Sequence, residues 1–307
     1  MLGFVLRRLL TALPTLLLVV AAAFFMMRAA PGGPFDSERQ LPPAIEAAVK
    51  AKYGLDQPLP AQFARYVGDL ARGDLGPSLK YRDKSVVDIL KENYGVSVVL
   101  GLSALVVAVV VGVTLGVAAA LRQNRPGDYA AMAIAVLGVC VPTFVTAPLL
   151  VLLFASTLGW LPNAGWNNGA LANLILPVGV LALPQIAIVS RLVRAGMIES
   201  LRSNFVRTAR AKGLPPWQVV TRHALPPALT PLIGYLGPAC AGLMTGSLIV
   251  ERIVGLPGLG KFFVVSALQG DYTVVMGMVI VYAALILLLN LVADLAAAAA
   301  DPRVRLA

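Results

Sequence analysis

The chain has 307 residues, of which 58% are hydrophobic and only 13% are charged, and its mean hydropathy is +0.81. A soluble domain normally carries about 25% charged residues, so this composition excludes both a water-soluble globular enzyme and a disordered chain. In a soluble protein the net charge of +10 would suggest a nucleic-acid partner. In a membrane protein it raises instead the question of which side of the bilayer holds the positive residues.

Six apolar stretches are long enough to cross the hydrocarbon core of a bilayer, which takes about 20 helical residues. In chain order they are Leu9–Met27, Val96–Leu121, Tyr129–Leu158, Leu171–Val189, Ala228–Val250 and Thr273–Ala299. The first is longer than the apolar core of a signal peptide, so we interpret it as a retained helix that directs insertion. The third contains Pro142 and Pro148 and is expected to be kinked or re-entrant. The sequence therefore predicts an all-α membrane protein with six transmembrane helices.

The distribution of charge between the loops predicts the orientation of these helices. With the N-terminus inside, the inner segments hold thirteen basic residues and three acidic ones. The long outer segment between Arg28 and Glu92 has ten basic and nine acidic residues and is nearly neutral. Because positively charged loops stay on the cytoplasmic side, both termini are predicted to be cytoplasmic. This asymmetry also accounts for the net charge without nucleic acid.

We divide the chain into three parts. Residues 1–30 form an N-terminal segment with the first span, residues 31–95 form an outer loop, and residues 96–307 form a core with the other five spans. Within the outer loop, Pro43–Tyr53 and Pro60–Arg72 have apolar residues at helical spacing, and a glycine follows each stretch. The sequence therefore predicts two short helices over the outer mouth of the protein.

The spans contain few groups that could carry out chemistry. Asp294 is the single ionisable residue that we place inside a span, whereas ion-coupled transporters generally need such groups at membrane depth. Cys140 and Cys240 lie in separate apolar stretches, and one histidine, His223, is too few for a histidine-based metal cluster. We therefore predict no catalytic residue, no metal and no cofactor on this chain, which is not an enzyme by itself.

One stretch, Gly255–Lys261, matches the first seven positions of a phosphate-binding P-loop, GxxxxGK. The eighth position should be a serine or threonine that holds Mg²⁺, and here it is Phe262. The predicted topology also places this stretch outside the cell, where ATP is not supplied. We interpret it as a glycine- and proline-rich turn between the last two spans.

The cytoplasmic loop of residues 190–227, between the fourth and fifth spans, is basic. Phe205–Lys212 is predicted to be a short helix that a glycine and two prolines end, and Trp217–Leu225 is predicted to be a second helix that ends at Pro226. Two short helices around a glycine turn predict a knob that projects into the cytoplasm. A basic surface that touches anionic lipid headgroups is the alternative.

The spacing within this loop resembles the cytoplasmic signature of binding-protein-dependent ABC importer permeases: EAA, three residues, glycine, nine residues, then I-x-L-P. On this chain the pattern falls on Arg207, Thr208, Ala209, Gly213, His223, Leu225 and Pro226. Arginine, threonine and histidine replace the usual Glu, Ala and Ile, and the peptide-permease branch of the family is similar in these departures. In that branch the knob is a coupling helix that inserts into a groove on a cytoplasmic ATPase. The resemblance implies that these residues, together with Lys212, contact the ATPase.

The resemblance extends along nearly the whole chain. Motifs similar to those of the family are Phe4–Arg8, Phe24–Arg28, Ala30–Gly32, Tyr53–Pro58, Gly73–Ser78, Gly255–Gly260, Asp271–Tyr272 and Asp301–Arg305. Leu41–Pro43, Lys80–Tyr81 and Trp166–Asn167 look most like the B-type membrane subunit of oligopeptide importers. The resemblance implies a type I permease fold in the inner (plasma) membrane of a bacterium, where the chain would form half of a translocation pore.

The partners implied by the resemblance are a second homologous permease, two cytoplasmic ABC ATPases that use ATP and Mg²⁺, an extracytoplasmic peptide-binding protein and the lipid bilayer. Two alternatives stay open. A sister importer of the same family would carry dipeptides, nickel chelates or glutathione, since cargo choice lies largely in the binding protein. A membrane-embedded sensor or scaffold would use the basic loop to hold a partner without transport.

Overall fold

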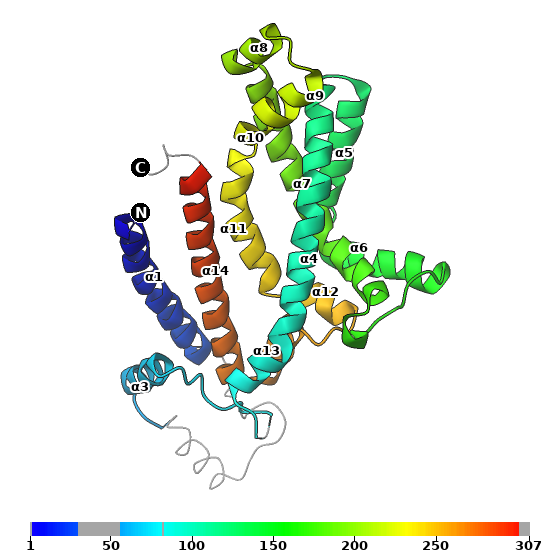
Figure 1. Cartoon of the computed structure of the whole chain (residues 1–307). Helices are drawn as coiled ribbons and strands as arrows, with labels where there is room; N and C mark the ends of the chain where they lie inside the picture. Colours follow the sequence, from blue (N-terminus) through cyan, green and yellow to red (C-terminus); the bar gives the residue numbers. More distant parts are fainter. Residues whose placement is uncertain (1, 30–55, 82, 301–307) are drawn as a thin grey trace.

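The computed structural model describes residues 2–29, 56–81 and 83–300, which form a bundle of helices joined by turns (Figure 1). The longer helices are α1 (Leu2–Ala29), α3 (Leu59–Ala71), α4 (Val86–Leu121), α5 (Pro126–Cys140), α7 (Leu171–Leu201), α11 (Thr230–Met244), α13 (Leu259–Gln269) and α14 (Tyr272–Ala300). The shorter ones are α6 (Thr143–Leu150), α8 (Asn204–Ala211), α9 (Pro216–Gln218), α10 (Leu225–Ala228) and α12 (Leu248–Ile253). The π-helical segments are η1 (Val151–Thr157) and η3 (Val219–Ala224), and η2 (Asn167–Gly169) is a 3₁₀-helix. This described part contains no β-strand, so the all-α prediction is confirmed.

Five helical stretches are long and apolar enough to cross a membrane, namely α1, α4, α7, α11 with α12, and α14. A sixth crossing is available if α5 and the following α6–η1 helix count as one span, although they meet at an angle of 102°. The bend falls at Val141 and Pro142, because proline has no N–H to donate and forces the residue before it into an extended conformation. The structure thus has five spans and one sharply bent pair, as the sequence predicts.

The helices α4 and α7 form the most extensive helix pair of the bundle. Their close approach depends on two glycines of α4. A Cβ atom on Gly112 would lie 2.7 Å from the side chain of Val189, and one on Gly116 would lie 2.7 Å from the carbonyl oxygen of Ser190. Small residues four positions apart let membrane helices pack this closely. Beside this pair, α11 packs against α4 and α14, and α1 packs against α14 (Figure 1).

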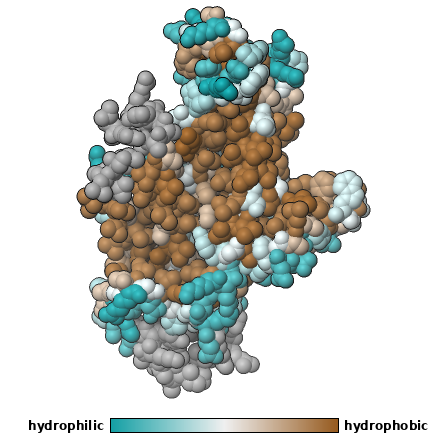
Figure 2. Space-filling model, viewed as in Figure 1, coloured by the Kyte–Doolittle hydropathy of each residue, from teal (hydrophilic) through white to brown (hydrophobic). Residues whose placement is uncertain are grey.

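The middle and the two ends of the bundle differ in their surface. Figure 2 shows a broad band of hydrophobic residues across the middle of the visible face and hydrophilic residues at both ends. One end carries a projection made of α8, α9, η3 and α10, which we call the knob (residues 204–228), and α1 begins and α14 ends on that side (Figure 1). The opposite end carries α3 and α13. A hydrophobic band between two polar ends is the surface of a protein that spans a bilayer.

The helix α3 confirms one of the two helices predicted for the outer loop, whereas the other, Pro43–Tyr53, lies outside the described residues. Aromatic side chains join α3 to the end of α1. The ring centre of Phe24 lies 5.3 Å from that of Phe63 and 6.0 Å from that of Tyr66. Burial raises the pKa of Tyr66 to about 12. The apolar residues at helical spacing are thus the ones that dock this helix.

Two helices extend beyond the apolar stretches that predicted them. The helix α4 begins at Val86, because Ser85 and Asp88 cap its first turn with reciprocal hydrogen bonds. The helix α7 continues to Leu201, well past the predicted end of the fourth span, so the loop after it is shorter than expected. Hydropathy marks the part of a helix that lies inside the bilayer, while backbone hydrogen bonding continues the helix beyond it.

Candidate functional site

The knob is built from α8 and from the helical run α9–η3–α10, which fold against each other across a tight turn. Gly213 forms this turn with a φ of +75°, a left-handed conformation that residues with a Cβ atom rarely adopt. Its N–H donates to the carbonyl oxygen of Arg210, and the N–H of Leu214 donates to that of Ala209. These bonds end α8 and reverse the chain at the residue where the sequence predicts a reversal.

The second half of the knob does not end at Pro226, as the sequence predicts, but stays helical through Ala228. Pro226 and Pro227 occupy the first turn of α10. The π-helical turn η3 lies directly before them, and Ala224 and Leu225 keep right-handed helical backbone angles across the junction. The two prolines therefore continue the helical run.

Small apolar side chains hold the two halves of the knob together. Val206 and Ala209 of α8 lie in one buried cluster with Val219 and Ala224 of η3. Ala209 belongs to the family-like pattern, yet only 5% of its surface is exposed. A larger side chain at this position would first disturb the packing of α8 on η3.

The other residues of the family-like pattern are more accessible. Arg207, Thr208, Lys212, Gly213 and Pro226 are exposed, and His223 and Leu225 are half-buried. Two aromatic residues outside the pattern, Phe205 and Trp217, expose 48% and 59% of their surface. The guanidinium of Arg222 lies 5.9 Å from the centre of the Trp217 ring, within cation–π range. In the sequence, both residues could have been recognised as aromatic side chains at the start of a short polar helix. Aromatic residues and arginine are enriched where proteins meet.

An ion pair braces the base of the knob. The Nε and Nη2 atoms of Arg194 each lie 2.6 Å from a carboxylate oxygen of Asp128. The same carboxylate accepts a hydrogen bond from the N–H of Asn124, which joins the α4–α5 turn to α7. Because Asp128 is buried, loss of its partner would leave an uncompensated charge. Arg194 therefore has a structural role, whereas the sequence suggests that it belongs to the exposed basic surface of the loop.

At the opposite end of the bundle, Asp271 joins two distant segments and is completely buried. Its carboxylate accepts hydrogen bonds from the hydroxyl of Ser78 and from the backbone N–H groups of Leu79 and Lys80. It also accepts one from the N–H of Val274 and so caps the start of α14. Two of the family-like motifs, Gly73–Ser78 and Asp271–Tyr272, are thereby brought together.

Glu251 is a second buried carboxylate at this end, and it lies inside the fifth membrane-spanning stretch. The sequence predicts that this span ends at Val250, with Asp294 as the single ionisable residue inside a span, whereas the apolar helical stretch of the structure runs to Ile253 and includes Glu251. The carboxylate of Glu251 accepts hydrogen bonds from the N–H groups of Gly260 and Lys261. These belong to the P-loop-like stretch, so amides that would face a phosphate in a P-loop are occupied by the chain itself.

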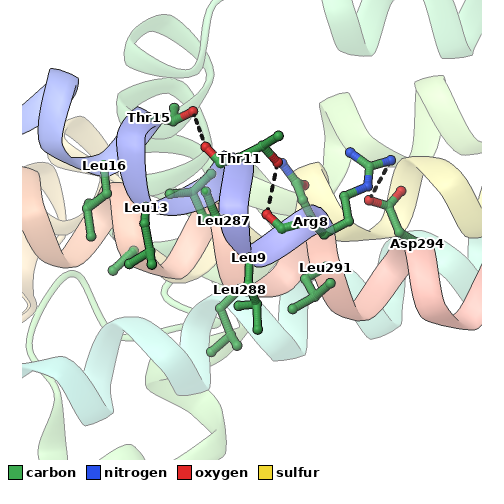
Figure 3. A pocket seen from close by; sticks show the side chains of 13 residues that line it. Arg8, Leu9, Thr11, Leu13, Thr15, Leu16, Leu287, Leu288, Leu291 and Asp294 are labelled. Carbon is green, nitrogen blue, oxygen red and sulfur yellow. Dashed lines mark hydrogen bonds and ion pairs between the residues drawn. The ribbon is translucent and has the colours of Figure 1, made fainter. Parts of the chain in front are cut away.

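A groove of about 380 Å³ runs between α1 and α14 near the knob end (Figure 3). Six of its thirteen lining residues are leucines, three from each helix, and at one end Arg8 lies 3.0 Å from the carboxylate of Asp294. The ion pair links the two helices and partly neutralises the aspartate. Among the residues that the structure describes, no group of three or more His, Cys, Asp or Glu could hold a metal ion.

Nearly the whole chain matches families of known proteins. Residues 112–306 match the family described as binding-protein-dependent transport system inner membrane component, and residues 1–101 match its N-terminal counterpart. The chain is 50% identical over 305 residues to the oligopeptide transport system permease protein OppB of Salmonella typhimurium, covering 99% of this chain and 100% of the relative. It is 40% identical over 306 residues to the dipeptide transport system permease protein DppB of Bacillus subtilis, covering 100% and 99%.

Among solved structures, the fold is similar to that of the MetNI methionine ABC transporter in an inward-facing conformation. The TM-score is 0.58 and the identity is 17%, over 69% of this chain and 96% of the solved chain. At this identity the likeness concerns the fold, which is the ABC importer permease fold that the sequence predicts. The chain therefore belongs to the family of binding-protein-dependent inner-membrane components, and is a multi-pass permease of the ABC importer type.

Proposed function

We propose that this chain forms one half of the translocation pore of an ATP-driven oligopeptide importer. The observation that carries the proposal is its 50% identity to the oligopeptide permease of Salmonella typhimurium, which covers 99% of this chain. Because the match has this extent, it includes the spans, the outer loops and the knob together.

On this proposal the knob lies in the cytoplasm and inserts into a groove on an ABC ATPase. Its contact surface consists of the exposed residues Phe205, Arg207, Thr208, Lys212 and Trp217. Ala209 and Gly213 set the shape of the knob from within, by packing and by backbone conformation. ATP binding would close the pair of ATPases, draw the two knobs of the permease pair together and open the pore outward to receive a peptide.

Three charged groups of the membrane-spanning helices support a cargo with variable side chains. Glu251 is held by hydrogen bonds within the chain. Arg194 is paired with Asp128, and Asp294 lies beside an arginine of α1. Charged groups that faced the path would repel peptides of like charge and retain those of opposite charge. A path from which these charges are withdrawn admits both kinds of peptide.

A complete importer would also contain a second homologous permease, two cytoplasmic ATPases that bind ATP and Mg²⁺, and an extracytoplasmic peptide-binding protein. We propose that this chain itself binds no nucleotide. Two observations support this, since Phe262 stands where a P-loop needs a hydroxyl group and Glu251 occupies the amides of Gly260 and Lys261.

Reconstitution of the complete complex in proteoliposomes tests the proposal. With loaded binding protein on the outer side and ATP on the side of the ATPases, labelled oligopeptide should move across the membrane, and it should not move when ATP is omitted. A complex that assembles and hydrolyses ATP without moving peptide would contradict the proposal and favour a scaffold or sensor.

Dipeptides are the second candidate cargo, because the chain is 40% identical to the dipeptide permease of Bacillus subtilis. The same proteoliposomes can be offered dipeptides and longer peptides, each with a binding protein that accepts it. Uptake of dipeptides alone, with both binding proteins present, would assign the narrower cargo to the pore itself.

The proposed orientation can be tested by cysteine labelling after Cys140 and Cys240 have been replaced. A cysteine introduced as Asp56→Cys, before α3, should react with a membrane-impermeant reagent in intact cells. One introduced as Pro215→Cys, in the knob, should react after the membrane is opened. Strong labelling of position 215 in intact cells would show that the knob lies outside the cell and that the proposed orientation is wrong.

A further inference from the structure

Glu251 joins three segments at the end of the bundle that carries α3. One of its carboxylate oxygens accepts a hydrogen bond from Ser97 Oγ of α4 at 2.7 Å, and the other accepts one from the N–H of Gly260 in α13 at 2.7 Å. A longer contact of 3.3 Å reaches the N–H of Lys261. Ser97 Oγ in turn accepts a hydrogen bond from the N–H of Leu259 at 2.9 Å. One side chain on α12, with 1% of its surface exposed, thus links α4, α12 and α13.

The residues around this carboxylate are glycines for a steric reason. A Cβ atom on Gly258 would lie 2.5 Å from Glu251 Cδ, and one on Gly260 would lie 2.9 Å from Oε2. On the other side of α12, a Cβ atom on Gly246 would lie 2.9 Å from Oε1. The turns before and after α12 therefore close around the carboxylate. This contact explains Gly260 of the P-loop-like pattern, whereas its first glycine, Gly255, has a left-handed φ of +69°.

These contacts stabilise a charged side chain away from water. The first N–H groups of a helix have no partner within the helix and carry a partial positive charge, and α13 directs two of them at the carboxylate. Hydrogen bonds to an ionised group are stronger than those between neutral groups. Separation of α13 from α12 would leave the carboxylate and the amides unpaired in a buried place. The two helices and the end of α4 should therefore move as one body.

We propose that Glu251 is a positioning residue for peptide entry, which holds α13 at the outer mouth of the pore so that the loaded binding protein meets a preformed entrance. The inference rests on the proposed function, in which the α3 end receives the cargo. With 11 residues, α13 is too short to cross the bilayer, and it lies at the α3 end between the fifth and sixth spans (Figure 1). Apolar side chains such as Leu259 pack α13 against the bundle, and Glu251 holds the loop that leads to this helix.

The first test is Glu251→Gln in the complete complex, reconstituted in nanodiscs. Glutamine keeps the size of the side chain but replaces one acceptor oxygen with an NH₂ group, which cannot accept from Ser97 or from the amides of α13. The concentration of loaded binding protein that half-maximally stimulates ATP hydrolysis should rise about tenfold, as expected for the loss of a charge-assisted hydrogen bond. The maximal stimulated rate should be retained, because the ATPases and the knob are untouched.

A second variant and a control separate position from charge. Gly258→Ala keeps the carboxylate but places a methyl group 2.5 Å from Glu251 Cδ, which should displace the loop and shift the half-saturating concentration in the same direction. Lys261→Ala is the control, because the N–H that contacts Glu251 is retained and the side chain is exposed. The control should match the wild type.

The thermal midpoint of each complex is measured beside the titration. A lower midpoint with an unchanged half-saturating concentration in both variants would give Glu251 a structural role alone and overturn the proposal. Failure of both variants to assemble would overturn it as well, since the side chain would then be needed for folding before any question of entry. A wild-type complex that loaded binding protein does not stimulate would instead refute the proposed function.

Discussion

The two ends of the bundle are held together by different kinds of contact. At the end that carries α3, the buried carboxylates of Glu251 and Asp271 accept hydrogen bonds from hydroxyl groups and from the amides of neighbouring segments. At the other end, the knob contains no acidic residue between positions 204 and 228. Its halves are joined by small apolar side chains and by the left-handed turn at Gly213.

This difference predicts which substitutions each end of the bundle tolerates. Removal of a buried carboxylate leaves several hydrogen-bond donors unpaired at once, so the α3 end should be sensitive to loss of charge. The knob buries no charge of its own and should respond to side-chain size and backbone conformation. Loss of its exposed cations should matter least, because exposed charges are well solvated.

The largest effect is expected for Asp271→Ala. The change uncaps α14 and leaves the hydroxyl of Ser78 and three buried or part-buried N–H groups without their acceptor, which should lower the free energy of unfolding by about 3 kcal/mol or more. The amount of folded protein in detergent and its thermal midpoint measure the loss. Asp271→Asn retains one acceptor oxygen and should lose less. Equal midpoints for the alanine variant and the wild type would show that the hydrogen bonds of Asp271 do not stabilise the α3 end of the bundle.

Ala209→Trp should come next and should act on the knob. A tryptophan cannot fit between α8 and η3, and overpacking of this kind costs about 1–3 kcal/mol. The protein should insert normally but lose stimulation of ATP hydrolysis by loaded binding protein, and peptide uptake with it. The matched control is Ala211→Trp, because Ala211 is exposed on the same helix. Comparable losses in both variants would mean that the internal packing of the knob is not what coupling requires.

Gly213 tests the backbone of the knob separately from its packing. Nothing lies within 4 Å of a Cβ atom placed on this residue, so a substitution meets no steric clash and its cost comes from the φ of +75°. Gly213→Val should cost about 1–2 kcal/mol and reduce coupling, whereas Gly213→Asn should reduce it less, because asparagine adopts this conformation more readily. Coupling is measured as peptide moved per ATP hydrolysed. Identical behaviour of the two variants would exclude a backbone effect.

The smallest effect is expected when Arg207, Arg210 and Lys212 are all replaced by glutamine. Exposed charges at the edge of a contact mainly influence the rate of association, so uptake should fall less than about threefold at low salt and less still at high salt. If this triple variant fails to transport while Gly213→Val transports normally, lipid contact explains the basic loop better than ATPase docking does.

Local sequence was enough to predict the parts of the fold that depend on the chemistry of single residues. The length of each apolar stretch predicts a span, Pro142 predicts the bend and Gly213 predicts the turn. In each case the conformation follows from the residue itself and its nearest neighbours. The same holds for α3, whose aromatic residues recur at helical spacing.

The contacts that the sequence did not reveal join residues far apart in the chain. Glu251 is bonded to Ser97 across 154 positions, and Asp271 to Ser78 across 193 positions. No local pattern marks such a pair, and Glu251 is further concealed because it directly follows an apolar stretch. Local sequence could not predict the burial of Ala209 either, because it depends on how η3 folds back onto α8.

During synthesis α1 leaves the ribosome long before α14 does, although the two helices lie against each other in the finished bundle (Figure 3). Arg8 can meet Asp294 only after every intervening span has been made. Until then α1 remains at the edge of the growing protein, with its leucines in lipid and its arginines at the membrane surface. The contact between α1 and α14 can therefore form only after the last span has been made, and a fault in either helix would act on this late contact.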